Sequence, residues 1–586
     1  MINRTIIKAK QSTPKCEDRY MFARLSSYCT RALVALALVF TGACQKTKLF
    51  DQASIISDVT NVVTHESDKE RIHNRVNVQS IQSNPFQGIA SDEPHAALVG
   101  RDVLEAGGSA ADAVVAMYFT LAVTLPSTAS LGGGGVCIIH ESKSGRTETL
   151  EFTATAPTVL PTTTTRPSAT PGAVRGISEL HRRYGRANWG NLIKPAEQLA
   201  RFGVPVSRAL ASDLKLAAGA LFMDPNARFI FARTDGTPLN EGDNLKQFDL
   251  AWVLTRLRRY GAGDFYAGQV SAALIRGAER SGGSLSHIDL RNTQALWQEA
   301  VGTNIGDFTV FTSPPPTAGA ITAMQIWSMI AADNRYLESN EIERRHLFAE
   351  ASMRAFQDRG ITLFSDGATA VPVTKLLDQK HLGQLMSNYK PNGHTALHSS
   401  TGQPRTNFEN PSATSFLVAD KDGLAIACLI SLHNLFGIGR IAEETGIVLA
   451  TAPKQQGMGP QSLAPMVVLD RASGDLKMIA AATGGAAAPT ALAWTAINVF
   501  LENMTLSDAI DGPRMHHGGR PDHVLFEPGS PSKWLIGLER RGHSVLTAGE
   551  IGQINAFHCE VGLAAGNKCF YSSDPRGHGL AIGLNP

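Results

Sequence analysis

The sequence predicts an α+β fold in which stacked β-sheets are covered by helices. Strand-like and helix-like stretches come in blocks along the chain, which is typical of layered folds of this class. The chain has 586 residues, 43% of them hydrophobic, and this is enough for a large buried core. Its 54 Gly and 29 Pro indicate many turns between the blocks.

The helical blocks follow from apolar periodicity and capping signals. Gly107-Gly108 ends the first helix, and Ser109, with Asp112 three residues on, caps the second. In the third block we expect stops at Gly185, Gly190, Gly203 and Gly261. The expected helical ranges are 94–106, the stretch that starts at 109, most of 176–280, 320–357 and 488–503.

The strand blocks are short apolar runs bounded by turn residues. A Gly-rich turn at 132–135 leads into the first of them, and a Lys421-Asp422-Gly423 turn joins two others in a hairpin. Residues 390–412, rich in Ser, Thr, Asn, Gly and Pro, form a loop inside the domain. The expected strands are 136–139, 308–311, 415–419, 424–430, 466–470 and 476–481.

Composition argues against several classes of protein. The formal net charge is +2, with no long run of one sign, so we expect no nucleic-acid partner. Nothing after residue 50 reaches the 18 unbroken apolar residues of a membrane span. The chain has no Cys-x-x-Cys pair and no His-Glu-x-x-His motif, so we expect no metal and no cofactor.

The N-terminus resembles a targeting segment. Arg24 and Arg31 precede the apolar run 32–40, and Thr41-Gly42-Ala43-Cys44 is similar to a bacterial lipobox. We therefore expect residues 1–44 to export the chain to the periplasm, with a membrane tether through Cys44. An uncleaved membrane anchor is the alternative. Residues 45–86 are polar and lack periodicity, which is typical of a flexible tether.

Cys559 and Cys569 flank a Gly566-Asn567 turn signal, and an exported protein could pair them across a hairpin. Two free thiols are equally compatible with the sequence, because spacing does not give the geometry that a disulfide needs.

An ordered set of motifs then resembles the γ-glutamyltransferase family. No single motif is specific, but their order and spacing match over about 500 residues. The motifs are Ala106 to Val114, Leu131 to Gly135, Thr170 to Val174, Ser313 to Pro316, Asp358-Arg359, Asp420 to Gly423, Phe436 to Gly439, Thr483-Gly484-Gly485, Ala509 to His517 and Ser573 to Arg576.

The resemblance implies an N-terminal nucleophile hydrolase fold, which is a four-layer αββα sandwich. It also implies a zymogen that cuts itself into a large part, residues 87–413, and a small part, residues 414–586, which stay associated. The small part would begin with a Thr whose own α-amino group serves as the base. By the same resemblance, the backbone amides of Gly484 and Gly485 would bind the oxyanion. A plain bend between strand and helix is the alternative for this glycine pair.

The cut site departs from the family pattern. Counting back from Asp420, the family's Thr falls on Ala413, which has no nucleophile. Thr414 is the best substitute, with Ala413–Thr414 as the scissile bond, provided that a one-residue bulge at the strand's start restores its aim. An ordinary β-branched strand residue is the alternative. Ser431 matches a second family hydroxyl, which hydrogen-bonds the nucleophile, or is a plain strand Ser.

The expected substrate pocket also departs from the family. The Arg that holds the γ-glutamyl carboxylate is Thr153 here, and a neutral Thr does not replace a guanidinium. An Asn falls on His433, the acidic partner of the substrate amine falls on Gln455, and one of two serines remains as Ser462. Arg440 or Lys454 could supply a cation, although both are more typical of surface charges. For His516 and His517, a structural role is favoured over a metal site.

Three functions follow as hypotheses. The first is a self-cleaving hydrolase or transferase of γ-glutamyl amides of the glutathione type. The second is the same fold and nucleophile acting on a different acyl amide, as in the related cephalosporin acylases. The third is an unprocessed pseudoenzyme that serves as a binding module, which Ala413 favours. The first two require a small-molecule amide substrate.

Overall fold

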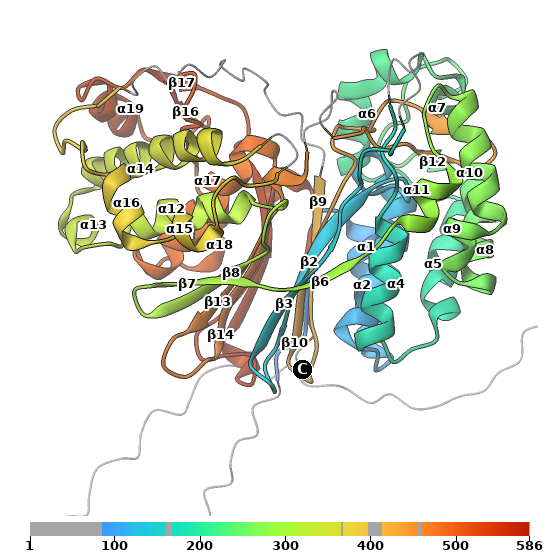
Figure 1. Cartoon of the computed structure of the whole chain (residues 1–586), viewed down its shortest axis with the longest axis horizontal. Coiled ribbons are helices and arrows are strands. Elements are labelled where there is room, and N and C mark those ends of the chain that lie inside the picture. The colour runs from blue at the N-terminus through green and yellow to red at the C-terminus, as the bar shows by residue number, and fades with distance from the viewer. Residues whose placement is uncertain (1–84, 160–166, 365–366, 397–412, 454–458, 585–586) are drawn as a thin grey trace, which may run out of the picture. The chain divides into compact units, whose positions relative to one another are not determined.

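In the computed structural model, two β-sheets pack face to face between two layers of helices (Figure 1). The structure describes residues 85–159, 167–364, 367–396, 413–453 and 459–584, all within one compact unit, Ser80–Pro586. The expected export segment and nearly all of the expected tether lie outside these residues. The arrangement confirms the predicted α+β class and the four-layer αββα sandwich.

The first sheet has seven antiparallel strands. In spatial order the strands are β20 (Leu580–Gly583), β1 (Gly88–Ser91), β9 (Ala413–Ala419), β10 (Leu424–Ser431), β2 (Gly134–Glu141), β3 (Arg146–Phe152) and β6 (Leu296–Glu299). Strands β1 and β20, from the two ends of the domain, pair at one edge, and β9, β10 and β2 form the centre.

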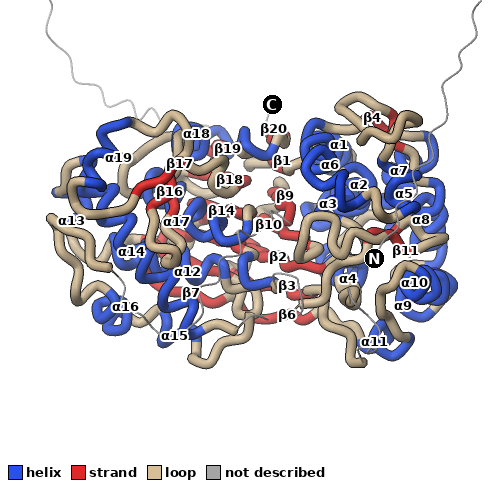
Figure 2. Tube along the Cα trace, turned by 90° about the horizontal axis from the view of Figure 1, so that it is seen from above, coloured by secondary structure: helices blue, strands red, loops and turns tan. Residues whose placement is uncertain are grey.

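The second sheet has six antiparallel strands and lies against the first. In order they are β19 (Cys569–Ser573), β18 (Gln553–Cys559), β14 (Leu476–Thr483), β13 (Ala464–Asp470), β8 (Phe308–Thr312) and β7 (Val301–Ile305). Seen from above in Figure 2, the strands of both sheets fill the middle of the molecule between the helices.

Each sheet has its own helical layer. The first sheet is covered by α1 (Pro94–Glu105), α2 (Ala110–Thr124) and α4 (Ala173–Tyr184), with α5 (Trp189–Phe202), α8 (Phe248–Tyr260) and α10 (Gln269–Arg280) farther out. The second is covered by α12 (Gly319–Ile330) and α17 (Ala488–Phe500), with α14 (Glu341–Thr362) packed on α12. Shorter helices used below are α3 (Pro126–Ala129) and α6 (Arg208–Leu221).

Local signals explain most of these boundaries. Ser109 and Asp112 form the expected capping box of α2. Gly203 and Gly261, both with positive φ, end α5 and α8 as predicted. The predicted stop at Gly190 is wrong, because Asn188 caps α5 by accepting a hydrogen bond from the Gly190 N–H.

Three hydrophobic cores separate the four layers. One lies between the first sheet and its helices and includes Phe416 and Val418, while a second lies between the second sheet and its helices. The third fills the space between the sheets and includes Leu417 and Ala419. Successive side chains of β9 therefore point to opposite sides of the first sheet.

Each of the two large sheets contains a disulfide between neighbouring strands. Cys559 pairs with Cys569 across the β18–β19 hairpin, so the structure selects the disulfide over two free thiols. The second disulfide, which was not predicted, joins Cys137 on β2 to Cys428 on the neighbouring β10. Its two cysteines lie on opposite sides of the predicted cut.

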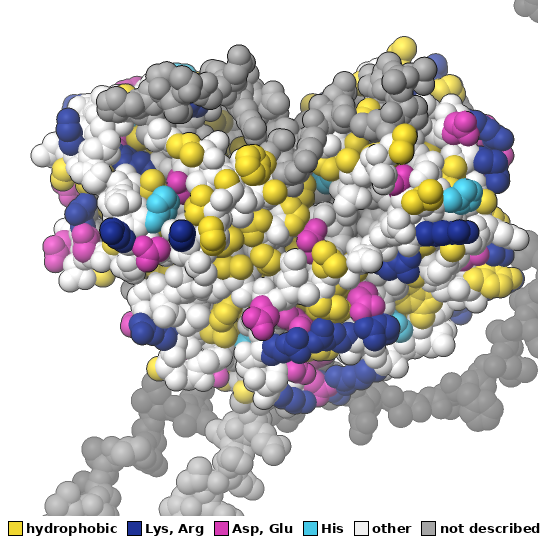
Figure 3. Space-filling view, viewed as in Figure 1, with side chains coloured by type: hydrophobic (Ala, Val, Ile, Leu, Met, Phe, Trp, Pro, Cys, Tyr) yellow, Lys and Arg dark blue, Asp and Glu magenta, His cyan; other side chains and the backbone are white. Residues whose placement is uncertain are grey.

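The surface in Figure 3 shows basic side chains accompanied by acidic ones. Arg146 and Arg183, for example, both pair with Glu148, and Arg182 pairs with Glu179. Such paired charges do not make the continuous basic surface that nucleic acid requires. Among the described residues, no helix combines the length and apolarity needed to cross a membrane.

Candidate active site

Most of the residues predicted for the site meet at one end of the sandwich, where β9 begins and β14 ends (Figure 2). Antiparallel pairing places the end of β10, the start of β2 and the end of β3 at this same end of the first sheet. The predicted residues found there are Thr414, Ser431, Ser462, Gly484, Gly485 and Thr153.

Ala413 and Thr414 point to opposite sides of the first sheet. Ala413 packs against the core between the sheets, directly opposite Ser431. The register of β9 with β10 runs unbroken from Ala413 to Ala419, so the expected bulge is absent and that expectation is wrong. The ladder keeps its ordinary alternation, and Thr414 lies on the side that faces the helices.

The Thr414 hydroxyl is paired with a buried carboxylate. Thr414 is 1% exposed, and its Oγ1 donates to Oδ2 of Asp92 at 3.0 Å. Asp92 follows β1 directly and is itself 4% exposed. A hydroxyl beside a buried carboxylate is the arrangement that activates an oxygen nucleophile. This pair was not predictable from the sequence, because its members are 322 residues apart.

Both oxygens of Asp92 are held by further donors. Oδ2 also accepts from the Ser415 backbone N–H at 2.7 Å, and Oδ1 accepts from Nδ2 of Asn555 at 2.6 Å. Asn555 lies on β18, so Asp92 is held from both sheets. Burial raises the pKa of Asp92 to about 6, although the hydrogen bonds from Ser415, Asn555 and Thr414 oppose this rise.

A second carboxylate shares this neighbourhood. Asp213 on α6 accepts from Oγ of Ser127 on α3 at 2.6 Å. Burial raises the pKa of Asp213 to about 6, and the nearby charge of Asp92 adds to the rise. Two carboxyl groups near the start of β9 therefore have a pKa of about 6.

Ser431 and His433 lie beside Ala413. The Ser431 hydroxyl accepts from the His433 backbone N–H at 2.9 Å, in a turn where His433 has a φ of 65°. His433 is buried, and its Nδ1 donates to the Thr451 carbonyl oxygen at 2.8 Å. Burial lowers the pKa of His433, which favours the neutral ring.

The two positions that follow β14, 484 and 485, have a backbone conformation that favours glycine. Gly484 and Gly485 have φ values of 104° and 62°, in the left-handed region. A Cβ on Gly484 would also lie 2.7 Å from the Cα of Gly552. These facts explain the bend, and the oxyanion role of the pair stays a prediction.

At the predicted substrate position 153, the Thr hydroxyl has a partner within its own strand region. This hydroxyl donates to Oε1 of Glu151 at 2.7 Å. Burial raises the pKa of Glu151, since its carboxylate is largely withdrawn from water. At Ser462, the hydroxyl accepts from Nη2 of Arg359 at 3.3 Å. Gln455 and Lys454 lie outside the described residues.

His516 and His517 each have a hydrogen-bond partner within the chain. His516 Nδ1 is 2.8 Å from the Thr490 hydroxyl, and His517 Nε2 is 3.1 Å from Oδ1 of Asp522. Burial lowers the pKa of His516 to about 3, so the ring is neutral.

A buried cluster of two histidines and a glutamate, two of them on α14, was not predicted from the sequence. Ligand atoms of His346, Glu350 and His543 lie within 4.8 Å of one another, and the His-x-x-x-Glu spacing on a helix is the signal that could have found them. However, Glu350 already pairs with Arg354 and accepts from His394 Nδ1 at 2.7 Å, and His346 hydrogen-bonds His543. The three side chains therefore already belong to a hydrogen-bond network with His394 and Arg354, although Nδ1 of His543 has no partner in it.

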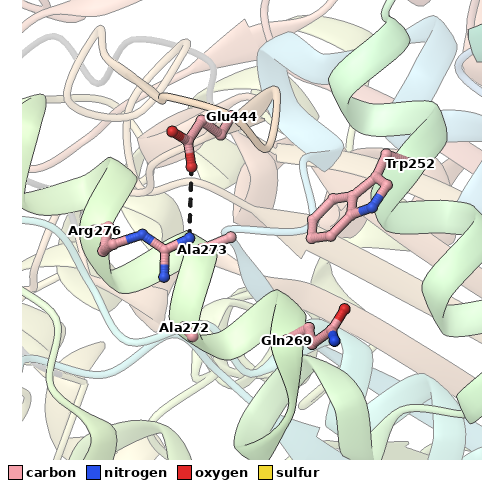
Figure 4. A pocket seen from close by; sticks show the side chains of 6 residues that line it. All are labelled: Trp252, Gln269, Ala272, Ala273, Arg276 and Glu444. Atoms are coloured by element: carbon pink, nitrogen blue, oxygen red, sulfur yellow. Dashed lines mark ion pairs between the residues drawn. The ribbon is translucent and has the colours of Figure 1, made fainter.

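A separate pocket of about 360 Å³ lies in the helical layer of the first sheet (Figure 4). Residues of α8 and α10 line it with Glu444, which is 3.5 Å from Nη2 of Arg276. None of the residues predicted for the site lines this pocket.

Comparison with known proteins agrees with the fold and the motifs. Residues 96–584 match the sequence model of the gamma-glutamyltranspeptidase family. The chain is 28% identical over 531 residues to a glutathione hydrolase proenzyme of Escherichia coli, covering 83% of this chain and 90% of the relative. It is 27% identical over 544 residues to a glutathione hydrolase proenzyme of Pseudomonas aeruginosa, covering 85% and 94%.

A solved structure supports the fold. The cephalosporin acylase from Bacillus halodurans superimposes with a TM-score of 0.73 at 20% identity, over 89% of this chain and 99% of that one. With the sandwich, the ordered motifs and the family match in agreement, the chain is a member of the gamma-glutamyltranspeptidase family and has the N-terminal nucleophile hydrolase fold.

Proposed function

We propose that the chain is a self-cleaving amide hydrolase or acyltransferase that cuts its own Ala413–Thr414 bond. The observation that supports this most is the Thr414 hydroxyl, held 3.0 Å from a buried carboxylate at the predicted cut. A hydroxyl on the residue that follows a peptide bond can attack that bond's carbonyl carbon, provided that a base removes its proton. The E. coli and P. aeruginosa relatives are both named proenzymes.

Cleavage would also free the Thr414 side chain from its fixed direction in the strand. In the intact chain, the strand forces Thr414 to the side opposite Ala413. Once the bond is cut, Thr414 becomes an N-terminal residue and is no longer held by its link to Ala413. Its α-amino group is then available as a base with a pKa near 8. Gly484 and Gly485, at the end of a strand that packs against β9, would bind the oxyanion.

The first candidate substrates are γ-glutamyl amides of the glutathione type, hydrolysed or passed to an acceptor amine. The support is the similarity to two glutathione hydrolases over more than four-fifths of this chain. No cofactor takes part in this chemistry, since the nucleophile, the base and the oxyanion donors all come from the chain.

The second candidate is a different acyl amide, and one contact favours it. Where the family has an arginine for the substrate carboxylate, this chain has Thr153, whose hydroxyl donates a hydrogen bond to the Glu151 carboxylate. A carboxylate at this position repels an acyl group that carries its own carboxylate. We expect such an enzyme to prefer an uncharged acyl chain.

For location, we propose export to the periplasm, with a lipid tether at Cys44. Two disulfides in a chain of this size are typical of an oxidising compartment and support the proposal.

A single preparation tests these alternatives. The exported chain is expressed and run on a reducing denaturing gel beside Thr414→Ala, and any small fragment is sequenced from its N-terminus. Two bands in the parent chain, one band in the variant and a fragment beginning at Thr414 are expected. One uncut band in both would support the unprocessed binding module instead. Anilides of γ-glutamyl, glutaryl and butanoyl groups then separate the two enzyme candidates, since they differ in the amine and the carboxylate.

A further inference from the structure

The carboxylate of Asp92 lies at the predicted cut, and hydrogen bonds from several donors fix its position. Oδ1 is held by Asn555, which also donates to Oγ of Ser415 at 2.8 Å. Oδ2 is held by the Ser415 N–H, and the Asp92 N–H donates to the Ser415 carbonyl at 3.3 Å. These bonds fix the carboxylate against β9, so that Oδ2 lies 3.0 Å from Oγ1 of Thr414.

We propose that Asp92 is the general base of the self-cleavage, taking the proton from the Thr414 hydroxyl as it attacks Ala413. The inference rests on the proposed cut at Ala413–Thr414. A general base must lie within about 2.6–3.2 Å of the atom that it deprotonates, and Oδ2 of Asp92 meets this requirement in the uncut chain. The α-amino group of Thr414 cannot do this work, because before the cut it is an amide.

The proposed step is balanced in atoms and charge. Oγ1 of Thr414 bonds to the carbonyl carbon of Ala413 while its proton passes to Oδ2 of Asp92. The intermediate then breaks its bond to the Thr414 nitrogen, which takes the proton back from Asp92. This leaves an ester between Ala413 and Oγ1. Water adds to the ester and splits it, giving the Ala413 carboxylate, the free Thr414 hydroxyl and a free α-amino group.

The electrostatics of the site suit this cycle. A base with a pKa of about 6 is mostly ionised at pH 7, yet its acid form gives a proton up readily. The charged groups that act on Asp92 are the carboxylates of Asp574 and Asp213. Asp574 is largely neutralised by Arg514, at 2.6 Å. We therefore expect the cleavage rate to rise with pH through about 6 and then to level off.

Three variants test the proposal in the full exported chain, with fragment formation followed by reducing gel. Asp92→Asn removes the base. The double variant Asp92→Asn/Asn555→Asp keeps one amide and one carboxylate in contact, but moves the charge away from Thr414. Asp213→Asn is the matched control, since it removes a second carboxyl of raised pKa that bonds Ser127 instead of Thr414. The thermal midpoint of each variant checks its folding.

We expect the two Asp92 variants to cleave at least about 100-fold more slowly, without the inflection near pH 6. Asp213→Asn should reach the parent rate above pH 7, with its inflection moved below pH 6, because a negative charge near Asp92 is lost. Cleavage of the double variant at the parent rate and with the parent pH profile would overturn the role of Asp92 while leaving self-cleavage intact. A parent chain that never cleaves, from pH 5 to 9, would overturn both. If Asp213→Asn slowed cleavage as much as the Asp92 variants do, the slower cleavage would be due to disturbed packing near the site. That result would also overturn the proposal.

Discussion

The disulfide between Cys137 and Cys428 should hold the two fragments together after self-cleavage. Cys137 belongs to the part before the cut and Cys428 to the part after it. If the chain cleaves, this bond joins the two fragments covalently. A non-reducing gel should therefore show a single band, and reduction should release the fragment 414–586. Cys559–Cys569 lies wholly within that fragment and cannot have this effect.

The same pair of disulfides allows a quantitative comparison. Cys137 and Cys428 are 291 residues apart, and Cys559 and Cys569 are 10 apart. Loop-closure entropy then gives losses of about 5.7 and about 2.7 kcal/mol when each bond is removed. A unit of about 500 residues has an unfolding entropy near 1 kcal/mol/K, so the thermal midpoint should fall by about 5 °C and about 3 °C.

The assay uses Cys→Ala pairs in a Thr414→Ala background, which keeps the chain continuous so that the loop lengths apply. Thermal unfolding is followed for the background, for Cys137→Ala/Cys428→Ala and for Cys559→Ala/Cys569→Ala. Each pair removes two buried sulfur atoms, so the packing loss is similar. A larger fall for the short loop would refute the entropic reasoning. Fragments that separate on a non-reducing gel of the parent chain would refute the link itself.

Three further predictions concern buried charge. Asp574→Asn leaves the fully buried Arg514 without its 2.6 Å partner and should cost about 3–5 kcal/mol, measured as a fall of about 3–5 °C in thermal midpoint. A fall below about 1 °C would contradict this. Asp92 has a folded pKa of about 6 against about 3.9 unfolded, so the stability it contributes is complete below pH 4 and lost as pH rises to 6. Urea denaturation of Asp92→Asn should show a flatter pH dependence over that window, and an unchanged slope would argue against the raised pKa. Thr153→Arg should raise kcat/KM for the glutaryl over the butanoyl anilide by about tenfold or more, whereas an unchanged ratio would place the acyl group elsewhere.

Much of the fold could be predicted from the sequence, because its signals are local. The capping box at Ser109 and the glycine at 261 fix helix ends through their own backbone geometry. Alternating apolar runs gave the strands on both sides of the Lys421-Asp422-Gly423 turn. Gly190 was misread because a glycine within the first turn of a helix resembles a helix stop unless the cap at Asn188 is considered.

The site was less predictable, because its contacts join distant parts of the chain. The sequence places Thr414 one residue from the family's nucleophile, but it cannot show which side of the sheet the hydroxyl faces. Asp92 and Asn555 come from strands in different sheets and meet only in the folded structure. The Cys137–Cys428 bond has the same origin, since β2 and β10 become neighbours only when the sheet forms. The loss of a guanidinium at Thr153, by contrast, could be read directly from the motif.

The N-terminal sequence of the small fragment, taken from a reducing gel of the exported full chain, tests the proposed self-cleavage. Cleavage at Ala413–Thr414 gives a fragment that begins Thr-Ser-Phe-Leu, from Thr414 onward, and that is absent in Thr414→Ala. A single uncut chain under reducing conditions, or a fragment with a different first residue, would contradict it.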